Sequence, residues 1–250
     1  LGKKSKIPSI YWQPDFQEIN NAEYISFKRK IFRRLNIYLF GYHSNRVLLS
    51  SNTVRKTLKK INFEAYKKSD VSKPTFSNLP IKSFKNIEYI KKKFNIKGNY
   101  FFLPNHFWTH KNHILVLQSL IELKKKKKLK NIQIVCTGLF NDYRNSNHKN
   151  KIIEYIKINR LENNFIILGI VNFDELMSLM KFSVAVINPS KSEGWSSTVE
   201  QAKSMGKFVL LSNLPVHKEQ NPDRSFFFGV NDYLILSKKL YFLNKKFSFK

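Results

Sequence analysis

The sequence has one cysteine, few acidic residues and no long apolar run. The single cysteine, Cys136, excludes an internal disulfide framework and suits a reducing compartment. No apolar stretch approaches the roughly 20 residues that a membrane-spanning helix needs, and the first residues lack the apolar segment of a signal peptide. We therefore expect a cytoplasmic protein. The chain starts with Leu1 rather than Met, and we expect it to be a fragment without its first N-terminal residues.

Acidic residues are outnumbered by basic ones, 17 to 45, which gives a formal net charge of +28. Clustered cations gain affinity for nucleic acid by releasing counterions, so a basic nucleic-acid-binding protein is one hypothesis. A joint excess of Lys, Asn, Ile and Phe is also what an A/T-rich coding sequence produces. The phenylalanines fall mainly inside apolar runs, where they build core rather than stack on bases. A basic surface would also favour an anionic membrane or phosphorylated ligands.

Several catalytic signatures are missing. The sequence has no Walker A segment, no G-x-G-x-x-G, no G-x-S-x-G elbow and no pair of cysteines. These absences argue against hydride transfer, phosphoryl transfer of the P-loop type and serine hydrolysis. Core material is ample, because 42% of the residues are hydrophobic and 22 are phenylalanine, and we expect a globular chain.

The second part of the chain, residues 99–250, alternates short β-rich runs with segments of helical period. This alternation predicts an α/β domain, a doubly wound parallel sheet with helices on both faces. The predicted strands are 100–105, 132–138, 165–170, 183–190 and 208–212, and the predicted helices are 111–123, 149–160, 173–181 and 232–243.

The first part is less regular. Residues 1–80 carry only two or three strand signals, within 7–17 and 46–61, which are too few for a complete α/β sheet. The second signal runs into a helix that Ser51 or Asn52 would cap. We interpret residues 1–80 as a partial domain and residues 81–98 as a linker.

Two glutamates seven positions apart stand out in SKSEGWSSTVEQAKSMGK, residues 190–207. A strand is expected before this loop and a helix after it, which is where open parallel sheets bind ligands. The N–H groups at the start of that helix could hold a phosphate. A structural explanation competes: Ser197 and Glu200 fit an S-x-x-E capping box, and Glu193 could complement the helix dipole. On spacing alone the structural explanation leads, but it leaves Glu193 and the turn after it poorly explained.

A second candidate is PNHFWTHKNH, residues 104–113, at the expected end of the first strand of residues 99–250. Lys111, at the start of a predicted helix, would set an ammonium beside free N–H groups and so could bind a diphosphate without a metal. An ordinary exposed lysine is the competing explanation in so Lys-rich a chain. Three histidines in the stretch suggest a metal, but no acid or cysteine of suitable spacing accompanies them, and we expect none.

These stretches resemble the retaining glycosyltransferases of family 4, which have the GT-B fold of two facing Rossmann-like domains. PSKSEGWSSTVEQAKSMGKFVLLSNLPVHKEQ is similar to the family's acid, Gly-aromatic turn and second acid before a small-residue helix. FFLPNHFWTHKNH is similar to one subgroup's first C-terminal-domain loop, and FIILGIVNFDELMSLM and CTGLFNDYR follow in the expected order. The resemblance implies a GT-B chain with a complete nucleotide-sugar-binding domain at 99–250. YWQPDFQE resembles a stretch from well inside the N-terminal domain, so residues 1–80 would be an incomplete acceptor-side domain.

The resemblance also implies a role for each matched residue. Glu193 would contact hydroxyls of the donor sugar and Lys111 the diphosphate, and both are our catalytic candidates. Glu200 would bind the ribose hydroxyls, because carboxylates accept hydrogen bonds from vicinal hydroxyls. The remaining candidates are Gly194, Trp195, Ser196, Ser197, Asn105, Thr137 and Gly138 for donor binding, and Asp15 and Gln17 on the acceptor side.

The implied function is transfer of a hexose from a nucleotide sugar to a glycan or lipid-linked acceptor, with retention at the anomeric carbon. The pathway would build a cell-surface polysaccharide or glycolipid, and no cofactor or metal would be needed. The expected partners are the nucleotide sugar, the acceptor and an anionic membrane, at whose inner face the protein would lie. Two alternatives stay open, a donor-binding remnant without turnover and a basic nucleic-acid-binding protein.

Overall fold

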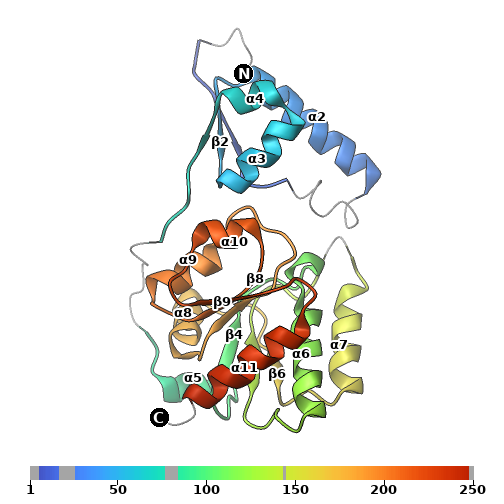
Figure 1. Ribbon diagram of the computed structural model, residues 1–250, viewed down its shortest axis with the longest axis vertical. Helices are drawn as coiled ribbons and strands as arrows, with labels where there is room; N and C mark the ends of the chain where they lie inside the picture. The colour runs from blue at the N-terminus through green and yellow to red at the C-terminus, as the bar shows by residue number, and fades with distance from the viewer. Residues whose placement is uncertain (1–5, 17–25, 77–83, 143–144, 248–250) are drawn as a thin grey trace. The chain divides into compact units, whose positions relative to one another are not determined.

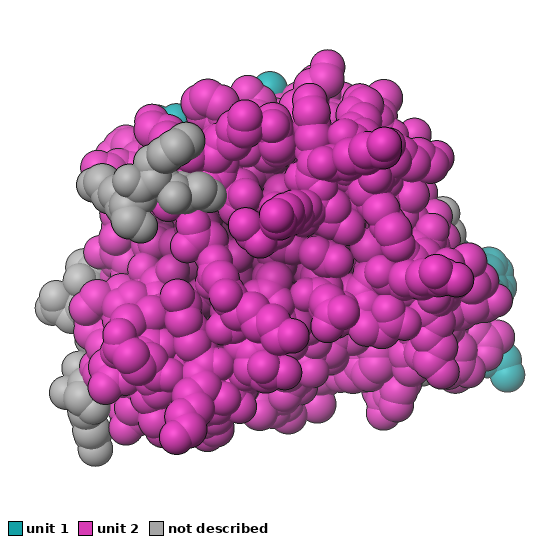
Figure 2. All heavy atoms as spheres, turned by 90° about the horizontal axis from the view of Figure 1, so that it is seen from below, with its two compact units in different colours: residues 1–75, 192–197, 214–221 teal, residues 76–191, 198–213, 222–250 magenta. Residues whose placement is uncertain are grey.

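The computed structural model describes residues 6–16, 26–76, 84–142 and 145–247 (Figure 1). The chain divides into two compact units, coloured teal and magenta in Figure 2. Unit 1 comprises residues 1–75, 192–197 and 214–221. Unit 2 comprises residues 76–191, 198–213 and 222–250. Each unit contains its own parallel sheet, so the predicted α/β class is confirmed.

Unit 2 is built on a six-stranded sheet in the order β6-β5-β4-β7-β8-β9. All neighbouring strands run parallel. The chain adds strands outward from β4 on one side and then from β7 on the other, so the order reverses between β4 and β7. This is the predicted doubly wound topology. The strands are β4 (Tyr100–Leu103), β5 (Gln133–Cys136), β6 (Phe165–Ile167), β7 (Val186–Asn188), β8 (Val209–Ser212) and β9 (Ser225–Phe228).

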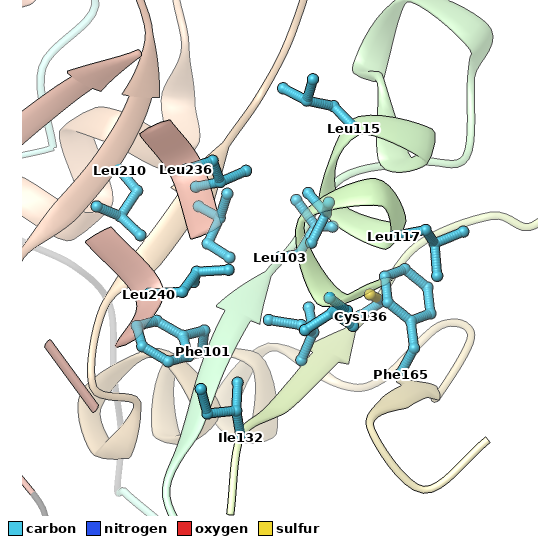
Figure 3. Close-up of a cluster of buried hydrophobic side chains, with 14 of the residues drawn as sticks. Phe101, Leu103, Leu115, Leu117, Ile132, Cys136, Phe165, Leu210, Leu236 and Leu240 are labelled. Atoms are coloured by element: carbon cyan, nitrogen blue, oxygen red, sulfur yellow. The ribbon is translucent and has the colours of Figure 1, made fainter. Parts of the chain in front are cut away.

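Helices cover both faces of this sheet, because alternate strand residues point to opposite sides. Phe101 and Leu103 pack with α6, α7 and α11, and Figure 3 shows Phe101 beside Leu240 of α11. Tyr100 and Phe102 pack on the other face with α5, α8 and α9. The helices are α5 (Ile87–Lys93), the 3-10 turn η2 (Thr109–Lys111), α6 (His113–Lys125), α7 (His148–Ile158), α8 (Phe173–Phe182), α9 (Ser197–Ser204) and α11 (Tyr233–Phe247).

Unit 1 has a three-stranded parallel sheet in the order β1-β2-β3. The predicted cap of its second helix is confirmed, because the Ser51 hydroxyl accepts the Val54 N–H at 3.0 Å. The elements are β1 (Ile10–Gln13), α2 (Phe27–His43), β2 (Arg46–Leu49), α3 (Asn52–Ile61), α4 (Phe63–Lys67), β3 (Ser69–Val71) and α10 (Pro215–Gln220). The buried hydrophobic core of this unit consists of Phe16, Ile37, Val47, Leu49, Val54, Leu58 and Ala65.

Candidate functional site

The reversal of strand order in unit 2 marks where a ligand is expected. In open α/β sheets, ligands bind outside the carboxyl ends of the strands at such a point. The two strands at the reversal are β4 and β7. The chain leaves β4 through residues 104–112, and it leaves β7 through residues 189–191, which continue into the 192–197 segment of unit 1. Both exits are stretches that the sequence singles out.

The loop after β4 is hydrogen-bonded to the segment after β7. The Asn112 amide donates to the carbonyls of Pro189 at 3.1 Å and Val230 at 2.9 Å. The Lys191 N–H donates to the His110 carbonyl at 2.8 Å. Asn112 has a left-handed backbone with φ 59°, which Asn tolerates better than most residues, and it ends the 3-10 turn just before α6. The two exits therefore form one connected edge within unit 2.

Lys111 is the last residue of the 3-10 turn in this loop and is half-buried. Its N–H bonds the Trp108 carbonyl at 2.8 Å. The start of the turn is fixed by Asp142, whose carboxylate accepts the N–H and the hydroxyl of Thr109 at 2.8 and 3.0 Å. The backbone that carries the predicted diphosphate-binding lysine is thus held at both ends.

The structure brings the predicted residues Asn105 and Gly138 together. A Cβ on Gly138 would lie 2.9 Å from the Asn105 oxygen and from the His106 nitrogen, and the φ of Gly138 is +124°. Only glycine suits both conditions. Thr137, also predicted, is buried beside it at the end of β5. The amide nitrogen of Asn105 is buried and has no hydrogen-bond partner among the described residues, so a donor group is set aside at this edge.

Burial lowers the pKa of two of the three histidines in residues 104–113. His113 begins α6, is fully buried and stacks on Phe107 with ring centroids 4.1 Å apart. Burial, with His148 nearby, lowers the pKa of His113 to about 3, so its ring is neutral at pH 7. Burial, with Lys111 nearby, also lowers the pKa of His106. Within the described residues, no group of three or more His, Cys, Asp or Glu side chains could hold a metal ion.

In unit 1, Gly194 lies against the chain that follows β1. A Cβ at this position would overlap the carbonyl oxygen of Pro14 and lie 2.8 Å from the Cβ of Asp15. No side chain fits there, which explains the glycine of the predicted Gly-aromatic turn. The acceptor-side candidate Asp15 is therefore a neighbour of Gly194, whereas Gln17 lies outside the described residues.

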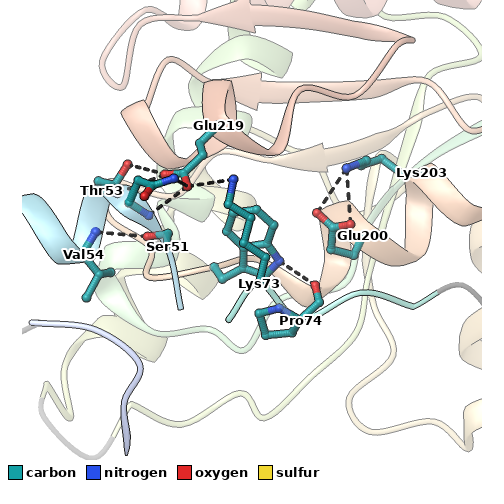
Figure 4. A network of polar contacts seen from close by, with 10 residues as sticks. Ser51, Thr53, Val54, Lys73, Pro74, Glu200, Lys203 and Glu219 are labelled. Carbon is teal, nitrogen blue, oxygen red and sulfur yellow. Dashed lines mark hydrogen bonds and ion pairs between the residues drawn. The ribbon is translucent and has the colours of Figure 1, made fainter. Parts of the chain in front are cut away.

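Trp195 is half-buried and is held at its ring nitrogen. Its Nε1–H donates to the Pro74 carbonyl at 2.8 Å. The Lys73 ammonium lies 5.7 Å from the ring centroid, and it pairs with Glu219 at 3.1 Å (Figure 4). The predicted aromatic of the turn thus belongs to a polar network inside unit 1.

Glu219, at the end of α10, is a residue that sequence reasoning missed. Its carboxylate accepts the backbone N–H groups of Asn52 at 2.8 Å and Thr53 at 3.0 Å, the first two of α3 (Figure 4). Although burial raises the pKa of Glu219, these hydrogen bonds and Lys73 outweigh it and leave the pKa below its usual value. The one sequence signal that could have indicated Glu219 is that acidic residues are few in this chain.

The two glutamates of residues 190–207 differ in how deeply they are buried. Glu200 is 6% exposed and pairs with Lys203 at 3.3 Å one turn along α9. Glu193 is half-buried in the 192–197 segment. The predicted capping box needs Ser197 at the position just before the helix. Helix α9 instead begins at Ser197, so Ser196 occupies that position.

A family model decides the identity. Residues 85–243 match the model of glycosyl transferases group 1, which is more than half of the chain. The chain belongs to the glycosyl transferases group 1 family. The matched range contains Lys111, Glu193 and Glu200. No curated protein sequence matches the chain.

Solved glycosyltransferase structures share the fold. One similar structure is Anabaena HepE in complex with UDP and glucose, with 15% sequence identity and a TM-score of 0.77; the match covers 96% of this chain and 62% of HepE. Another is a glycosyltransferase of Rickettsia africae, with 21% identity and a TM-score of 0.65; the match covers 88% of this chain and 57% of that protein. A third is WaaG, a glycosyltransferase involved in lipopolysaccharide biosynthesis, with 14% identity and a TM-score of 0.68; the match covers 95% of this chain and 69% of WaaG. The predicted GT-B type of fold is confirmed. The chain spans less than two thirds of the length of HepE and of the Rickettsia protein. Among its described residues, no helix is long and apolar enough to cross a membrane.

Proposed function

We propose that this chain is a glycosyltransferase, which uses a nucleotide-sugar donor and transfers the sugar to a glycan or lipid-linked acceptor with retention, as in family 4. The observation that carries the proposal is the reversal of strand order at β4 and β7, with Lys111 on one exit and the Glu193 to Glu200 segment on the other. HepE, which shares the fold, was solved with UDP and glucose, which supports a nucleoside diphosphate as the donor's leaving group.

Each residue has a proposed contact with the donor. The Lys111 ammonium and the N–H groups at the start of α9 bind the diphosphate, because cations and helix N-termini favour anions. Glu200 accepts hydrogen bonds from the ribose hydroxyls, and Glu193 accepts them from the sugar. The buried amide of Asn105 supplies a further donor group at the same edge of unit 2.

The proposed reaction breaks the bond between the anomeric carbon and the diphosphate oxygen. The acceptor hydroxyl forms the new bond on the same face of the sugar and gives up its proton, and the nucleoside diphosphate leaves with the bonding electrons. Positive charge fixed in advance where the leaving oxygen gains negative charge lowers the barrier of such a step. Lys111 is the proposed source of that charge, and we propose no metal or cofactor.

The proposed setting is the synthesis of a cell-surface polysaccharide or glycolipid in the cytoplasm, at the inner face of the membrane. The net charge of +28 supports contact with anionic lipid, because basic groups are attracted to a negatively charged surface. WaaG acts in lipopolysaccharide biosynthesis, and its fold is shared.

A thermal-shift screen tests the proposal. UDP, GDP and their sugar conjugates are added to the chain, with duplex DNA as the rival ligand, at low and moderate salt. We expect at least one nucleotide to raise the melting temperature with little dependence on salt. Protection by DNA alone, lost steeply as salt rises, would instead favour the nucleic-acid-binding alternative. Turnover measured with the protecting nucleotide sugar then separates an enzyme from a protein that only binds the donor.

A further inference from the structure

Gln220, the last residue of α10, holds both peptide groups of Ser196. Its Oε1 accepts the Ser196 N–H at 3.3 Å and its Nε2 donates to the Ser196 carbonyl at 2.9 Å. Gln220 is 2% exposed and Ser196 is 5% exposed. The carboxamide therefore pairs with this residue as a neighbouring strand would, and water does not compete for the bonds.

The helix that carries Gln220 is firmly placed. Pro215 opens α10, a position where its fixed φ suits a helix. Val216 and His217 are buried, with exposed fractions of 1% and 0%. The helix ends at Gln220, and the next residue, Asn221, has a left-handed backbone (φ 40°) and donates its N–H to the His217 carbonyl at 3.2 Å. A side chain on such a support holds what it binds in one conformation.

Ser196 is the residue immediately before α9. Fixing its two peptide groups fixes the direction in which the chain enters the helix, and with it the direction of the first N–H groups of α9. The Ser196 N–H itself already donates to Gln220.

We propose that Gln220 is a positioning residue for donor binding. It does not touch the donor; it sets the Ser196 backbone so that the neighbouring N–H groups at the start of α9 face the diphosphate. This inference rests on the proposed function, because it assumes that a diphosphate binds at the start of α9.

A matched control exists in the same chain. Gln133, at the start of β5, also makes two backbone bonds: Oε1 accepts the Lys97 N–H at 2.9 Å and Nε2 donates to the Asn163 carbonyl at 3.0 Å. It is 8% exposed, and it lies at the opposite end of its strand from the edge that carries Thr137. Gln220→Ala and Gln133→Ala therefore remove the same kinds of bond from two different places.

The experiment measures UDP affinity by calorimetry and melting temperature for the chain and both variants. We expect both variants to lower the melting temperature, and only Gln220→Ala to weaken UDP binding, by about tenfold for two lost hydrogen bonds. Amide exchange of residues 192–197 should accelerate in Gln220→Ala alone. Equal UDP affinity in all three proteins, or equal losses in both variants, would overturn the positioning role. Failure of the unaltered chain to bind UDP would overturn the UDP-type donor, and the positioning role with it.

Gln220→Glu should make UDP affinity depend on pH, which a purely structural role of Gln220 would not do. Its carboxylate can still accept the Ser196 N–H, but its second oxygen would face the Ser196 carbonyl without a proton to donate. A buried carboxyl in this position has a raised pKa and donates once protonated. We expect UDP affinity of Gln220→Glu, relative to the unaltered chain at the same pH, to recover as pH falls. A ratio that is constant with pH would contradict the proposed pairing.

Discussion

Removing the Glu219 carboxylate should destabilise unit 1, because it caps α3 from outside the helix. The first N–H groups of a helix have no partner within it. Ser51 takes that of Val54, and Glu219 takes those of Asn52 and Thr53. Glu219→Gln keeps one acceptor oxygen but turns an NH2 group toward an N–H. Since one lost cap costs about 0.5 to 2 kcal/mol, we expect about 1 to 2 kcal/mol less free energy of unfolding at pH 7, measured by urea denaturation.

The matched control is Glu64→Gln on α4, which removes the same charge from unit 1. Glu64 is 71% exposed and pairs with Lys67 at 2.9 Å one turn along its helix, so the change should cost under about 0.5 kcal/mol. Equal losses for the two variants would refute the capping argument, because they would leave only an effect of net charge.

The same prediction has a pH dependence. The folded-state pKa of Glu219 lies below its usual value, so its stabilisation is fully present above the unfolded pKa of roughly 4.3 and is lost as pH falls through the folded pKa. The difference between the unaltered chain and Glu219→Gln should be constant above about pH 5.5 and shrink below about pH 4. A difference that grows on acidification would have the wrong sign for this account.

Three further experiments test the packing. Gly194→Ala should lower the free energy of unfolding by more than about 2 kcal/mol, because its Cβ would overlap a backbone carbonyl, whereas Gly98→Ala, with no atom within 4 Å of its Cβ, should be nearly neutral in the same denaturation assay. Tyr100→Phe should lower the free energy of unfolding by about 1 kcal/mol, since the buried Tyr100 hydroxyl donates to an α8 carbonyl at 2.8 Å. An unchanged urea midpoint would contradict a stabilising role of this hydrogen bond. Burial raises the pKa of the Cys136 thiol, so a disulfide reagent should label it only as the chain unfolds, and rapid labelling in native buffer would argue against the packed core.

The sequence predicts unit 2 well because its central strands are buried on both faces and appear as continuous apolar runs. It misses β9, whose first three residues are only half-buried, and α10, which has six residues. It also misses α2, where only Ile37 and Gly41 are buried while Phe32 and other large apolar side chains are exposed. No single buried stripe marks that helix in the sequence.

The candidate site is predictable only where chain order decides it. Lys111 and Glu200 follow strands that meet at one end of a sheet, so their importance can be argued from position. Glu219 acts on residues 166 and 167 positions away, and Gln220 on a residue 24 positions away. Such partners become visible only when the fold brings them together.

The most direct test of the account is a calorimetric titration of UDP into the unaltered chain, Glu200→Gln and Glu122→Gln. Glu122, on α6, pairs with Lys126 four positions later, much as Glu200 pairs with Lys203 on α9, and Glu122 is remote from the start of α9 in the sequence. We predict saturable binding to the unaltered chain, unchanged binding to Glu122→Gln and about tenfold weaker binding to Glu200→Gln, as expected for one lost charge-assisted hydrogen bond. Equal UDP affinity in all three proteins, or none in the unaltered chain, would contradict a donor site at β7 and α9.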